Sequence, residues 1–405
     1  MSVSHASIST SSDDEVPAGA LDVIELYRLF AQVADPRKAR GIRHRLATVL
    51  TVMVFAVLSG AKNYREIGDR AADLPAVLLV PAGVRAGSRS GTLRVPSGST
   101  IRRVAEGIDA QAADLLVGRW LRERATRLAT SARPEGDGEV DGSFGVAVDG
   151  KTVRNSGAGQ PEANVRLFSA MLHDEAIVIA QVRVPVDTTE ITQVKALLDP
   201  VDLTGAVVTG DAAHTQHATA QYILDRDADY VLTVKGNQPG VLRAVRAGML
   251  TSAIHGYHLQ EERGHGRSVR RETWTSQAQE IVFPGAAQIF RIRREVCDLA
   301  GRTLSVETVH GITSLSADQA TAPAVAAWVR GHWAIENKLH WVRDVVFGED
   351  HQHAYRGASA HTTGIIHNLA ISLLRLAGVT QIKRATERIA ADRTRILPIL
   401  AASHT

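Results

Sequence analysis

Two short apolar segments, each followed directly by an aspartate, constrain the fold of this chain more than any other feature. Residues 145–148 lead into Asp149, and residues 206–210 lead into Asp211. Short apolar runs bounded by turn residues are typical of buried strands, so each aspartate is expected at the carboxyl end of a strand. Asp149 is followed by Gly150, and because an Asp-Gly pair after a strand is usually only a turn, either aspartate alone is weak evidence of a site.

The order of the expected elements restricts the fold further. The expected strands cover residues 144–148, 165–172, 176–184, 206–209 and 230–234, and the expected helices cover residues 190–198 and 217–226. This order, βββαβαβ, predicts an α/β fold in which three antiparallel strands come first and parallel strands follow through right-handed crossovers, as in a ribonuclease H-like core. The ends of the first and fourth strands lie side by side in such a sheet, so Asp149 and Asp211 are expected to meet.

A third acid, Glu336, lies in a segment from residue 324 to 344 in which only Gly331 opposes a helix. At about 100° per residue, Glu336 and Arg343 share one stripe of that helix, with His332 one turn earlier. Taken alone, the helix is better explained by a solvated stripe of ordinary ion pairs. Together with the two aspartates, however, Glu336 completes an Asp, Asp, Glu set, which suits a site that holds two Mg²⁺ ions for phosphoryl transfer.

Four ordered motifs resemble those of the H-repeat-associated, ISAs-type insertion-sequence transposases. The motifs occupy residues 149–154, 210–216, 230–238 and 332–344 with 347–350. The similarity covers about residues 21–378 and implies a DDE enzyme with a ribonuclease H-like core. It also implies that Asp149, Asp211 and Glu336 are the catalytic triad and the ligands of two Mg²⁺ ions, with Mn²⁺ able to substitute.

The glutamate helix departs from the signature of related DDE transposases, which carry Tyr, Arg, Glu and Lys there. Val329 stands at the Tyr position, His332 at the Arg position and Arg343 at the Lys position. The roles of these helper residues are therefore open. Arg343 either stabilises charge on the scissile phosphate or pairs with Glu336 or Asp344.

The resemblance implies a bacterial insertion-sequence transposase that cleaves phosphodiester bonds at the element ends and transfers the freed 3′-hydroxyl into target DNA. The implied partners are double-stranded DNA, as terminal inverted repeats and target, and a second copy of the chain in a homodimer on DNA. The residues expected to contact DNA are Lys151, Arg102, Arg103, Lys235, Asn237, Arg263, Arg267, His332 and Arg343. For Lys151 and Asn237, an ordinary solvated turn residue is the alternative.

The pattern of residues 21–130 is helical and predicts a small all-α domain before the core. Residues 46–61 form the longest apolar run, which is short for a membrane span and indicates a buried helix. A helix that starts near Ser99 carries Arg102 and Arg103 in its first turns, as a DNA-reading helix would, although arginines are common on any helix surface.

Residues 240–316 are expected to form a β-rich insertion that begins with a helix. Arg263 and Arg267 lie in a stretch of glycines and arginines, residues 263–271, that is typical of a loop tracking DNA phosphates. An exposed basic hairpin that protects a sheet edge explains the same stretch equally well. The expected parts of the chain are a disordered tail (1–20), a helical domain (21–130), a linker (131–142), the first part of the core (143–239), the insertion (240–316), the second part of the core (317–378) and a helical tail (379–405).

Composition bears mainly on the compartment. The single cysteine, Cys297, excludes an intramolecular disulfide and fits a reducing cytoplasm. Residues 1–19 lack the basic and apolar segments of a signal peptide, so a cytoplasmic, nucleoid-associated protein without membrane contact is expected. The formal net charge of only +3 predicts no strong positive potential over the whole surface, so DNA contacts have to come from local basic patches.

Three other functions fit parts of the pattern. His332, Glu336 and His340 have the i, i+4, i+8 spacing that could ligate zinc on one helix face, but zinc does not explain the two strand-end aspartates. A ribonuclease H-like hydrolytic nuclease shares the fold and the triad but does not join DNA ends. A catalytically inactive relative that only binds DNA, as a repressor, is less consistent with acids at all three positions.

Overall fold

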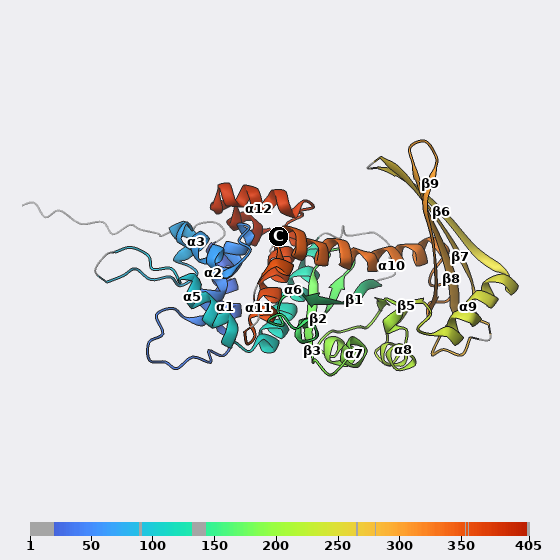
Figure 1. Ribbon diagram of the computed structural model, residues 1–405, viewed down its shortest axis with the longest axis horizontal. Helices are drawn as coiled ribbons and strands as arrows, with labels where there is room; N and C mark the ends of the chain where they lie inside the picture. Colours follow the sequence, from blue (N-terminus) through green and yellow to red (C-terminus); the bar gives the residue numbers. More distant parts are fainter. Residues whose placement is uncertain are drawn as a thin grey trace, which may run out of the picture.

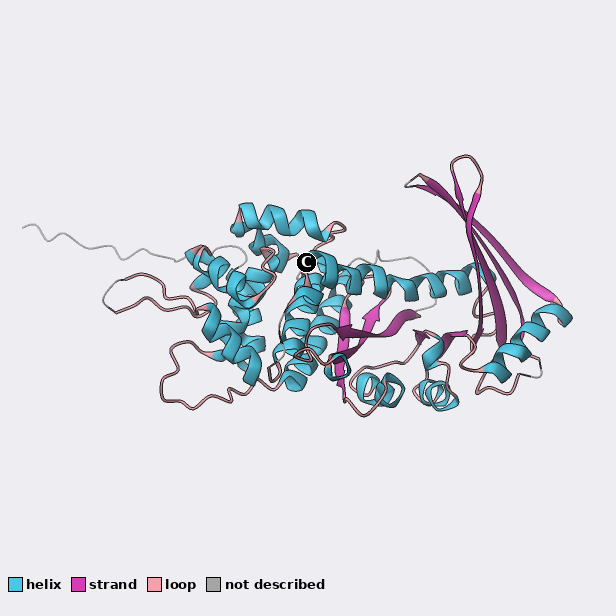
Figure 2. Ribbon diagram, in the orientation of Figure 1, coloured by secondary structure: helices cyan, strands magenta, loops and turns pink. Residues whose placement is uncertain are grey.

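The computed structural model describes residues 20–88, 91–131, 143–264, 266–279, 281–352, 354 and 356–402. Over these residues the chain is a mixed α/β protein with one nine-stranded sheet in the order β3-β2-β1-β4-β5-β9-β8-β7-β6. Helices fill one end of the molecule and long strands fill the other (Figure 1, Figure 2). The expected tail and linker lie outside the described residues, except for their ends at Ala20 and Ser131.

The middle of the sheet has the predicted strand order. The elements are β1 (Phe144–Val153), β2 (Val165–Leu172), β3 (Val178–Val184), α7 (Glu190–Leu198), β4 (Ala206–Gly210), α8 (His217–Leu224) and β5 (Asp229–Val234). β1 pairs antiparallel with β2 and parallel with β4, which confirms that the first and fourth strands are neighbours. The expected end of the first strand at Val148 is wrong, because Asp149 and Gly150 still pair with β2 and so do not form a turn.

The N-terminal region packs onto one end of this sheet. Its helices are α1 (Ala20–Ala31), α2 (Leu46–Leu58), α3 (Tyr64–Ala72), α4 (Ala76–Leu79), α5 (Gly98–Gly107) and α6 (Ala110–Ser131). Every residue of α2 is buried, which confirms the buried helix predicted in the apolar run. No helix in the described part of the chain is long and apolar enough to cross a membrane. α6 contacts β3, so the helical region adjoins the sheet directly.

Four long strands extend the sheet at its other end. After α9 (Pro239–Thr251) come β6 (Ile254–Gly264), β7 (Arg267–Gln277), β8 (Gln288–Asp298) and β9 (Thr303–Thr313). β9 pairs antiparallel with β5, so the β-rich insertion continues the core sheet, and its strands, named here the β-arm, project beyond the rest of the molecule (Figure 1). The sequence did not predict β6 as a strand, because none of its residues is buried.

The helix that carries Glu336 widens where that residue lies. α10 (Ala322–Ile335) continues as two π-helical segments, η3 (Glu336–His340) and η4 (Val342–Val346), in which an N–H bonds the carbonyl five residues earlier. π-helical turns are rare and are frequent at functional sites. Gly331 allows α10 to lie close to the loop after β2, because a Cβ there would overlap the imidazole of His173.

The C-terminal part is helical. It consists of α11 (Ser359–Leu376), α12 (Ile382–Ala391) and α13 (Ile396–Ala401). α11 is buried along nearly its whole length and contacts α2, α6 and β3, so it joins the sheet to the N-terminal helices. α12 contacts α2 and η4, which attaches the end of the chain to the segment that follows Glu336.

Candidate active site

Asp149 lies on β1, beside the end of β4. Its Oδ1 accepts a hydrogen bond from the N–H of Gly150 at 2.9 Å, and its Oδ2 is 3.4 Å from Nδ1 of His340. His340 is the last residue of η3, so the π-helical segment lies directly against this carboxylate. Burial lowers the pKa of His340 to about 3, with help from the nearby positive charges of Arg343 and Lys151, so its imidazole is neutral beside Asp149.

Asp211 follows β4 and begins the short 3₁₀ turn η2 (Ala212–His214). Its Oδ1 accepts a hydrogen bond from the N–H of Ala213 at 2.9 Å. The loop after β5 supports this turn, because Nδ2 of Asn237 donates to the carbonyl of Ala212 at 2.6 Å. Asn237 therefore has a structural partner next to the site.

The predicted acids interact electrostatically in the folded chain. Burial raises the pKa of Asp149 to about 7, while the N–H of Gly150 opposes that rise. The negative charges of Asp211, Glu336 and Glu190 raise the pKa of Asp149 further. The geometry agrees with this, because β1 pairs with β4 at Val148 and Gly210, directly before Asp149 and Asp211, and η3, which begins with Glu336, contacts Asp149 through His340.

Glu190 is a residue of this site that the sequence did not reveal. It is the first residue of α7, and its carboxylate lies over β1, since a Cβ on Gly150 would overlap its Oε1. Its Oε2 is 3.9 Å from Nε2 of His214, and burial together with the charge of Asp211 raises its pKa. The sequence feature that could have revealed this contact is Gly150, because a glycine inside a strand often marks the close approach of another group.

The prediction that Glu336 and Arg343 lie on the same face of the helix is wrong, because the helix widens between them. Glu336 is exposed, whereas Arg343 is 0% exposed. Residues seven apart nearly align in an α-helix, but i→i+5 bonding puts more residues in each turn and rotates Arg343 away. Its Nε and Nη2 donate to the two carboxylate oxygens of Glu349 at 2.8 and 2.5 Å. The expected DNA contact of Arg343 is wrong for this structure, because the side chain has no surface to offer.

Two further residues expected to contact DNA are also buried. Nζ of Lys151 lies 2.5 Å from Asp344 and 3.6 Å from Asp350, which ties β1 to the segment after Glu336. His332 shares a hydrogen bond of 3.3 Å with Oγ1 of Thr209, and burial lowers its pKa to about 4. A paired, buried ammonium and a neutral, buried imidazole present no free positive charge to a phosphate, so both expectations are wrong.

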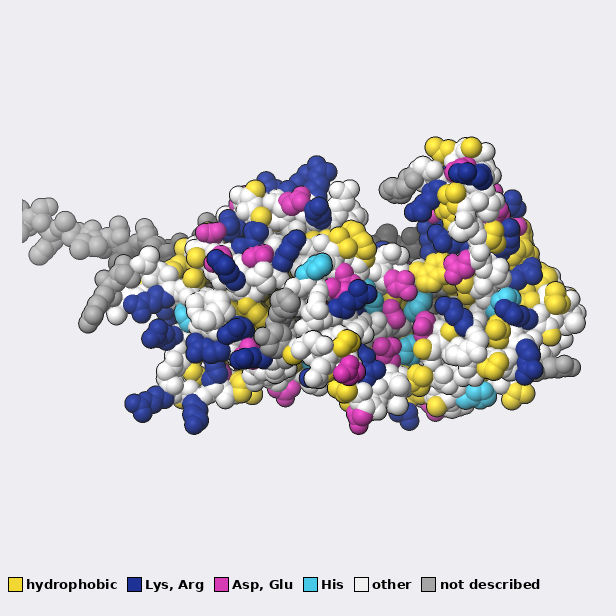
Figure 3. All heavy atoms as spheres, viewed as in Figure 1, with side chains coloured by type: hydrophobic (Ala, Val, Ile, Leu, Met, Phe, Trp, Pro, Cys, Tyr) yellow, Lys and Arg dark blue, Asp and Glu magenta, His cyan; other side chains and the backbone are white. Residues whose placement is uncertain are grey.

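The other residues expected to contact DNA are exposed, and their roles stay predictions. They are Arg102 and Arg103 on α5, Lys235 and Asn237 after β5, and Arg263 and Arg267 beside the turn between β6 and β7. Figure 3 shows Asp and Glu side chains grouped in the middle of one face, with Lys and Arg side chains toward both the helical end and the β-arm. This distribution leaves basic surface on both sides of the acidic centre.

The acids have the ligand chemistry of a divalent-cation site but are not closed around one. Across the described ranges, no three His, Cys, Asp or Glu side chains stand in an arrangement that could hold a metal. Carboxylate oxygens suit Mg²⁺ and Mn²⁺, and a cation would relieve the repulsion that helps to raise the pKa of Asp149. Within the same ranges, the zinc interpretation of His332, Glu336 and His340 finds no ligand set.

Comparisons with known proteins agree on one family. The family model described as "Transposase DDE domain" matches residues 142–373, and the model described as "DDE_Tnp_1-associated" matches residues 27–121. "Putative transposase YncI" of Escherichia coli O157:H7 is 28% identical over 94% of this chain and 95% of its own length. "H repeat-associated putative transposase YhhI" of Escherichia coli K12 is 27% identical over 94% and 99%.

One solved structure is similar at a lower level. The piggyBac transposase synaptic complex with hairpin DNA, determined by cryo-electron microscopy, covers 95% of this chain and 79% of its own. The sequence identity is 10% and the TM-score is 0.40, which is too low to support a conclusion.

Proposed function

The chain belongs to the family of DDE-domain transposases, and from that premise we propose that it cuts DNA at the ends of a bacterial insertion sequence and joins the freed 3′-hydroxyl to target DNA. The proposed catalytic unit is a ribonuclease H-like core made of β1 to β5, α7, α8 and the helix that carries Glu336. The N-terminal helices form the proposed all-α domain before it.

One observation carries the catalytic part of the proposal. The strand pair of Val148 with Gly210 sets Asp149 and Asp211 next to each other, and His340, four residues after Glu336 on η3, lies 3.4 Å from Asp149. No short-range sequence pattern requires these acids to meet. Their approach is therefore a property of the fold, and it supports a shared role as oxygen ligands.

The proposed cofactor is a pair of divalent cations held by Asp149, Asp211 and Glu336, with Mg²⁺ as the usual ion and Mn²⁺ as a substitute. When bound, such ions supply Lewis-acid activation of water and stabilise the charge on the attacking and leaving oxygens. Asp149, Asp211 and Glu336 would hold these ions through their carboxylate oxygens. Two in-line displacements then follow, the first by water at the element end and the second by the 3′-hydroxyl on target DNA.

Neighbouring residues keep the acids in place in this proposal. His340 is neutral and lies 3.4 Å from Asp149, where it can donate a hydrogen bond and fix the carboxylate. Asn237 holds the turn that carries Asp211. The ion pair of Lys151 with Asp344 keeps β1 and the helix of Glu336 together, so it positions two of the ligands relative to each other.

The proposed partners are terminal inverted repeats, target DNA and a second copy of the chain on DNA. Exposed residues around the acidic centre, Arg102, Arg103, Lys235, Arg263 and Arg267, would contact phosphates. Two element ends have to be joined to one target, which favours a homodimer on DNA. Because the proposed substrate is chromosomal DNA, we expect the protein to be associated with the nucleoid.

A cleavage and joining assay tests this function. The purified protein is incubated with labelled duplexes of the element ends, a supercoiled target plasmid and Mg²⁺ or Mn²⁺, and the products are resolved on denaturing gels. Asp149→Asn, Asp211→Asn and Glu336→Gln should each abolish nicking and joining. Glu175→Gln, in the turn between β2 and β3 at the other end of β1, is the matched control and should retain both activities.

Each other outcome has a definite meaning. Nicked ends without joined products identify a hydrolytic nuclease, and binding without nicking by the wild-type protein identifies a DNA-binding repressor. Cleavage by Asp149→Asn at the wild-type rate contradicts the assigned active site.

A further inference from the structure

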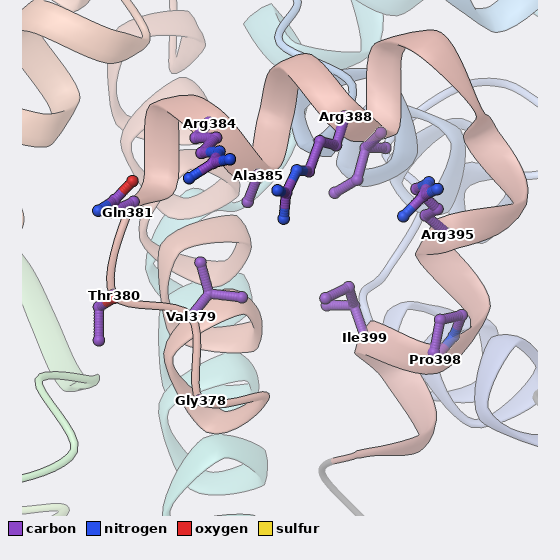
Figure 4. Close-up of a pocket in the computed structure, with 11 residues that line it drawn as sticks. Gly378, Val379, Thr380, Gln381, Arg384, Ala385, Arg388, Arg395, Pro398 and Ile399 are labelled. Atoms are coloured by element: carbon purple, nitrogen blue, oxygen red, sulfur yellow. The ribbon is translucent and has the colours of Figure 1, made fainter.

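A pocket of about 480 Å³ lies between α12 and α13, in the C-terminal region of the chain (Figure 4). Three arginines line it: Arg384 and Arg388 from α12, and Arg395 from the turn before α13. The remaining lining residues are apolar or uncharged, among them Val379 and Ile399. Among the described residues that line the pocket, none is acidic.

The positive charges of this pocket are largely free. Arg384 and Arg388 are exposed, and their side chains form no hydrogen bond or ion pair with the described residues. Nε of Arg395 is 3.6 Å from Asp392, in a pair whose side chains are both more than half exposed, so water weakens it. In Figure 4 the side chain of Arg388 extends from α12 toward the space above Ile399, and Arg384 lies farther along the same helix, above Val379.

Two free arginines four residues apart on a helix destabilise that helix, because like charges at this spacing repel. Glu387 and Asp392 lie near these arginines in the sequence, but neither lines the pocket, so no carboxylate neutralises the guanidinium groups within it. The guanidinium group presents several donors in a plane and matches the oxygens of a phosphate. A phosphate bound between the arginines would remove the repulsion and would be held by charge-assisted hydrogen bonds.

The pocket is attached to the catalytic helix. α12 contacts η4, which lies directly after the segment that begins with Glu336. In Figure 1, α12 and the free end of the β-arm rise on the same side of α10, one at each end of it. Figure 3 shows Lys and Arg side chains over both of these parts, with acidic side chains between them. A DNA duplex placed over the acids would therefore meet basic surface at α12 as well as at the β-arm.

We infer that the pocket between α12 and α13 binds the phosphate backbone of the DNA substrate at a position flanking the cleavage site. Arg384 and Arg388 contact phosphate oxygens, and the apolar floor lies under the sugar of the same strand. This inference rests on the proposed function, since the ligand is the DNA on which the transposase acts. It assigns a function to the C-terminal helices, which lie outside the catalytic elements.

The test measures DNA binding by the full chain in the absence of divalent cations, so it does not depend on cleavage. A fluorescently labelled duplex of the element end is titrated with wild-type protein and with Arg384→Gln/Arg388→Gln at several salt concentrations. The slope of log K against log salt should fall by about 1.8, because each phosphate that an arginine neutralises contributes about 0.9. Lys383→Gln, an exposed residue of α12 outside the pocket lining, is the control and should keep the wild-type slope. Thermal unfolding checks that the variants are folded.

Two results overturn the inference. The first is a salt slope of Arg384→Gln/Arg388→Gln equal to that of the wild-type protein. The second is a salt slope of Lys383→Gln that falls, for its one lost charge, as much as the double variant's slope falls for each of its two. A parallel arm uses inorganic phosphate as the probe. If phosphate stabilises the wild-type protein but not the double variant, and the two proteins have equal salt slopes for DNA binding, the pocket is a free-phosphate site. That result also overturns the assignment to DNA. Failure here leaves the cleavage assay with Asp149→Asn unaffected, so the two proposals fail separately.

Discussion

Replacement of Arg343 by methionine is the sharpest test of how the catalytic helix is held. Arg343 is 0% exposed and Glu349 is 1% exposed, and the two share a bidentate pair at 2.8 and 2.5 Å. The pair lowers the pKa of Glu349 well below its usual range, against the opposing effect of burial. Nδ1 of His367 lies 2.8 Å from the same carboxylate. Methionine fills most of the space but leaves His367 as the remaining side chain that hydrogen-bonds the Glu349 carboxylate among the described residues.

The magnitude follows from the burial of the pair. Removing one partner of a buried ion pair leaves an uncompensated charge and costs about 3–5 kcal/mol, whereas replacing both partners with apolar residues of similar volume is often neutral. Arg343→Met should therefore lower the free energy of unfolding by about 3–5 kcal/mol. Arg343→Met/Glu349→Leu should recover most of that loss.

Urea unfolding followed by circular dichroism measures both variants against the wild-type protein. DNA affinity at several salt concentrations is measured in parallel, under conditions where all variants are folded. The salt slope should not change, because a buried arginine releases no counterions from DNA. A single variant that loses less than about 1 kcal/mol, or a double variant as unstable as the single one, contradicts the structural role of this pair. A fall of about 0.9 in the salt slope would instead support the DNA contact of Arg343 that the sequence predicted.

Three further outcomes are expected. Gly150→Ala should push the carboxylate of Glu190 out of the site, because the new Cβ would overlap its Oε1, and should slow cleavage by roughly tenfold with little change in thermal stability. Asp149→Asn should stabilise the metal-free protein at pH 8 by up to about 4 kcal/mol and remove the fall in stability between about pH 4 and 7, as followed by urea unfolding. Arg263→Gln/Arg267→Gln should lower the salt slope of DNA binding by about 1.8, as measured by anisotropy.

The sign of the pH effect follows from the direction of the shift. Because the pKa of Asp149 in the folded chain, about 7, lies above that of an unfolded aspartate, its contribution to stability is fully present below about pH 4 and is lost as the pH rises from there to about 7. A wild-type protein whose metal-free stability is flat over this range would contradict the burial of Asp149. For Gly150→Ala, the control is Gly236→Ala, where a Cβ meets nothing within 4 Å, and equal rates for the two variants would remove Glu190 from the site.

The sequence predicted the parts of the site that depend on local pattern and strand order. Asp149 and Asp211 follow apolar runs, and the order of strands and helices was enough to make their strands neighbours. The helix of Glu336 was also predicted, because its spacing is helical up to that residue. These features depend on periodicity and connection rules, which a single sequence displays.

The features that the sequence missed depend on tertiary contacts. The widening at η3 decides which residues face the acids, yet its composition differs little from that of an α-helix. Lys151, His332 and Arg343 look like free cations in the sequence, and only the fold supplies the partners that bury them. Glu190 was missed because its place over Gly150 is set by the packing of α7 on the sheet.

A change of metal preference tests the central claim most directly. Asp149→Cys replaces a hard oxygen ligand with a thiolate, which binds Mg²⁺ poorly and accepts Mn²⁺ more readily. If Asp149 holds a divalent ion, this variant should fail to cleave labelled element ends in Mg²⁺ and regain cleavage in Mn²⁺, while Asp149→Asn stays inactive in both. Equal activity of the cysteine variant in the two ions would contradict direct ligation by Asp149.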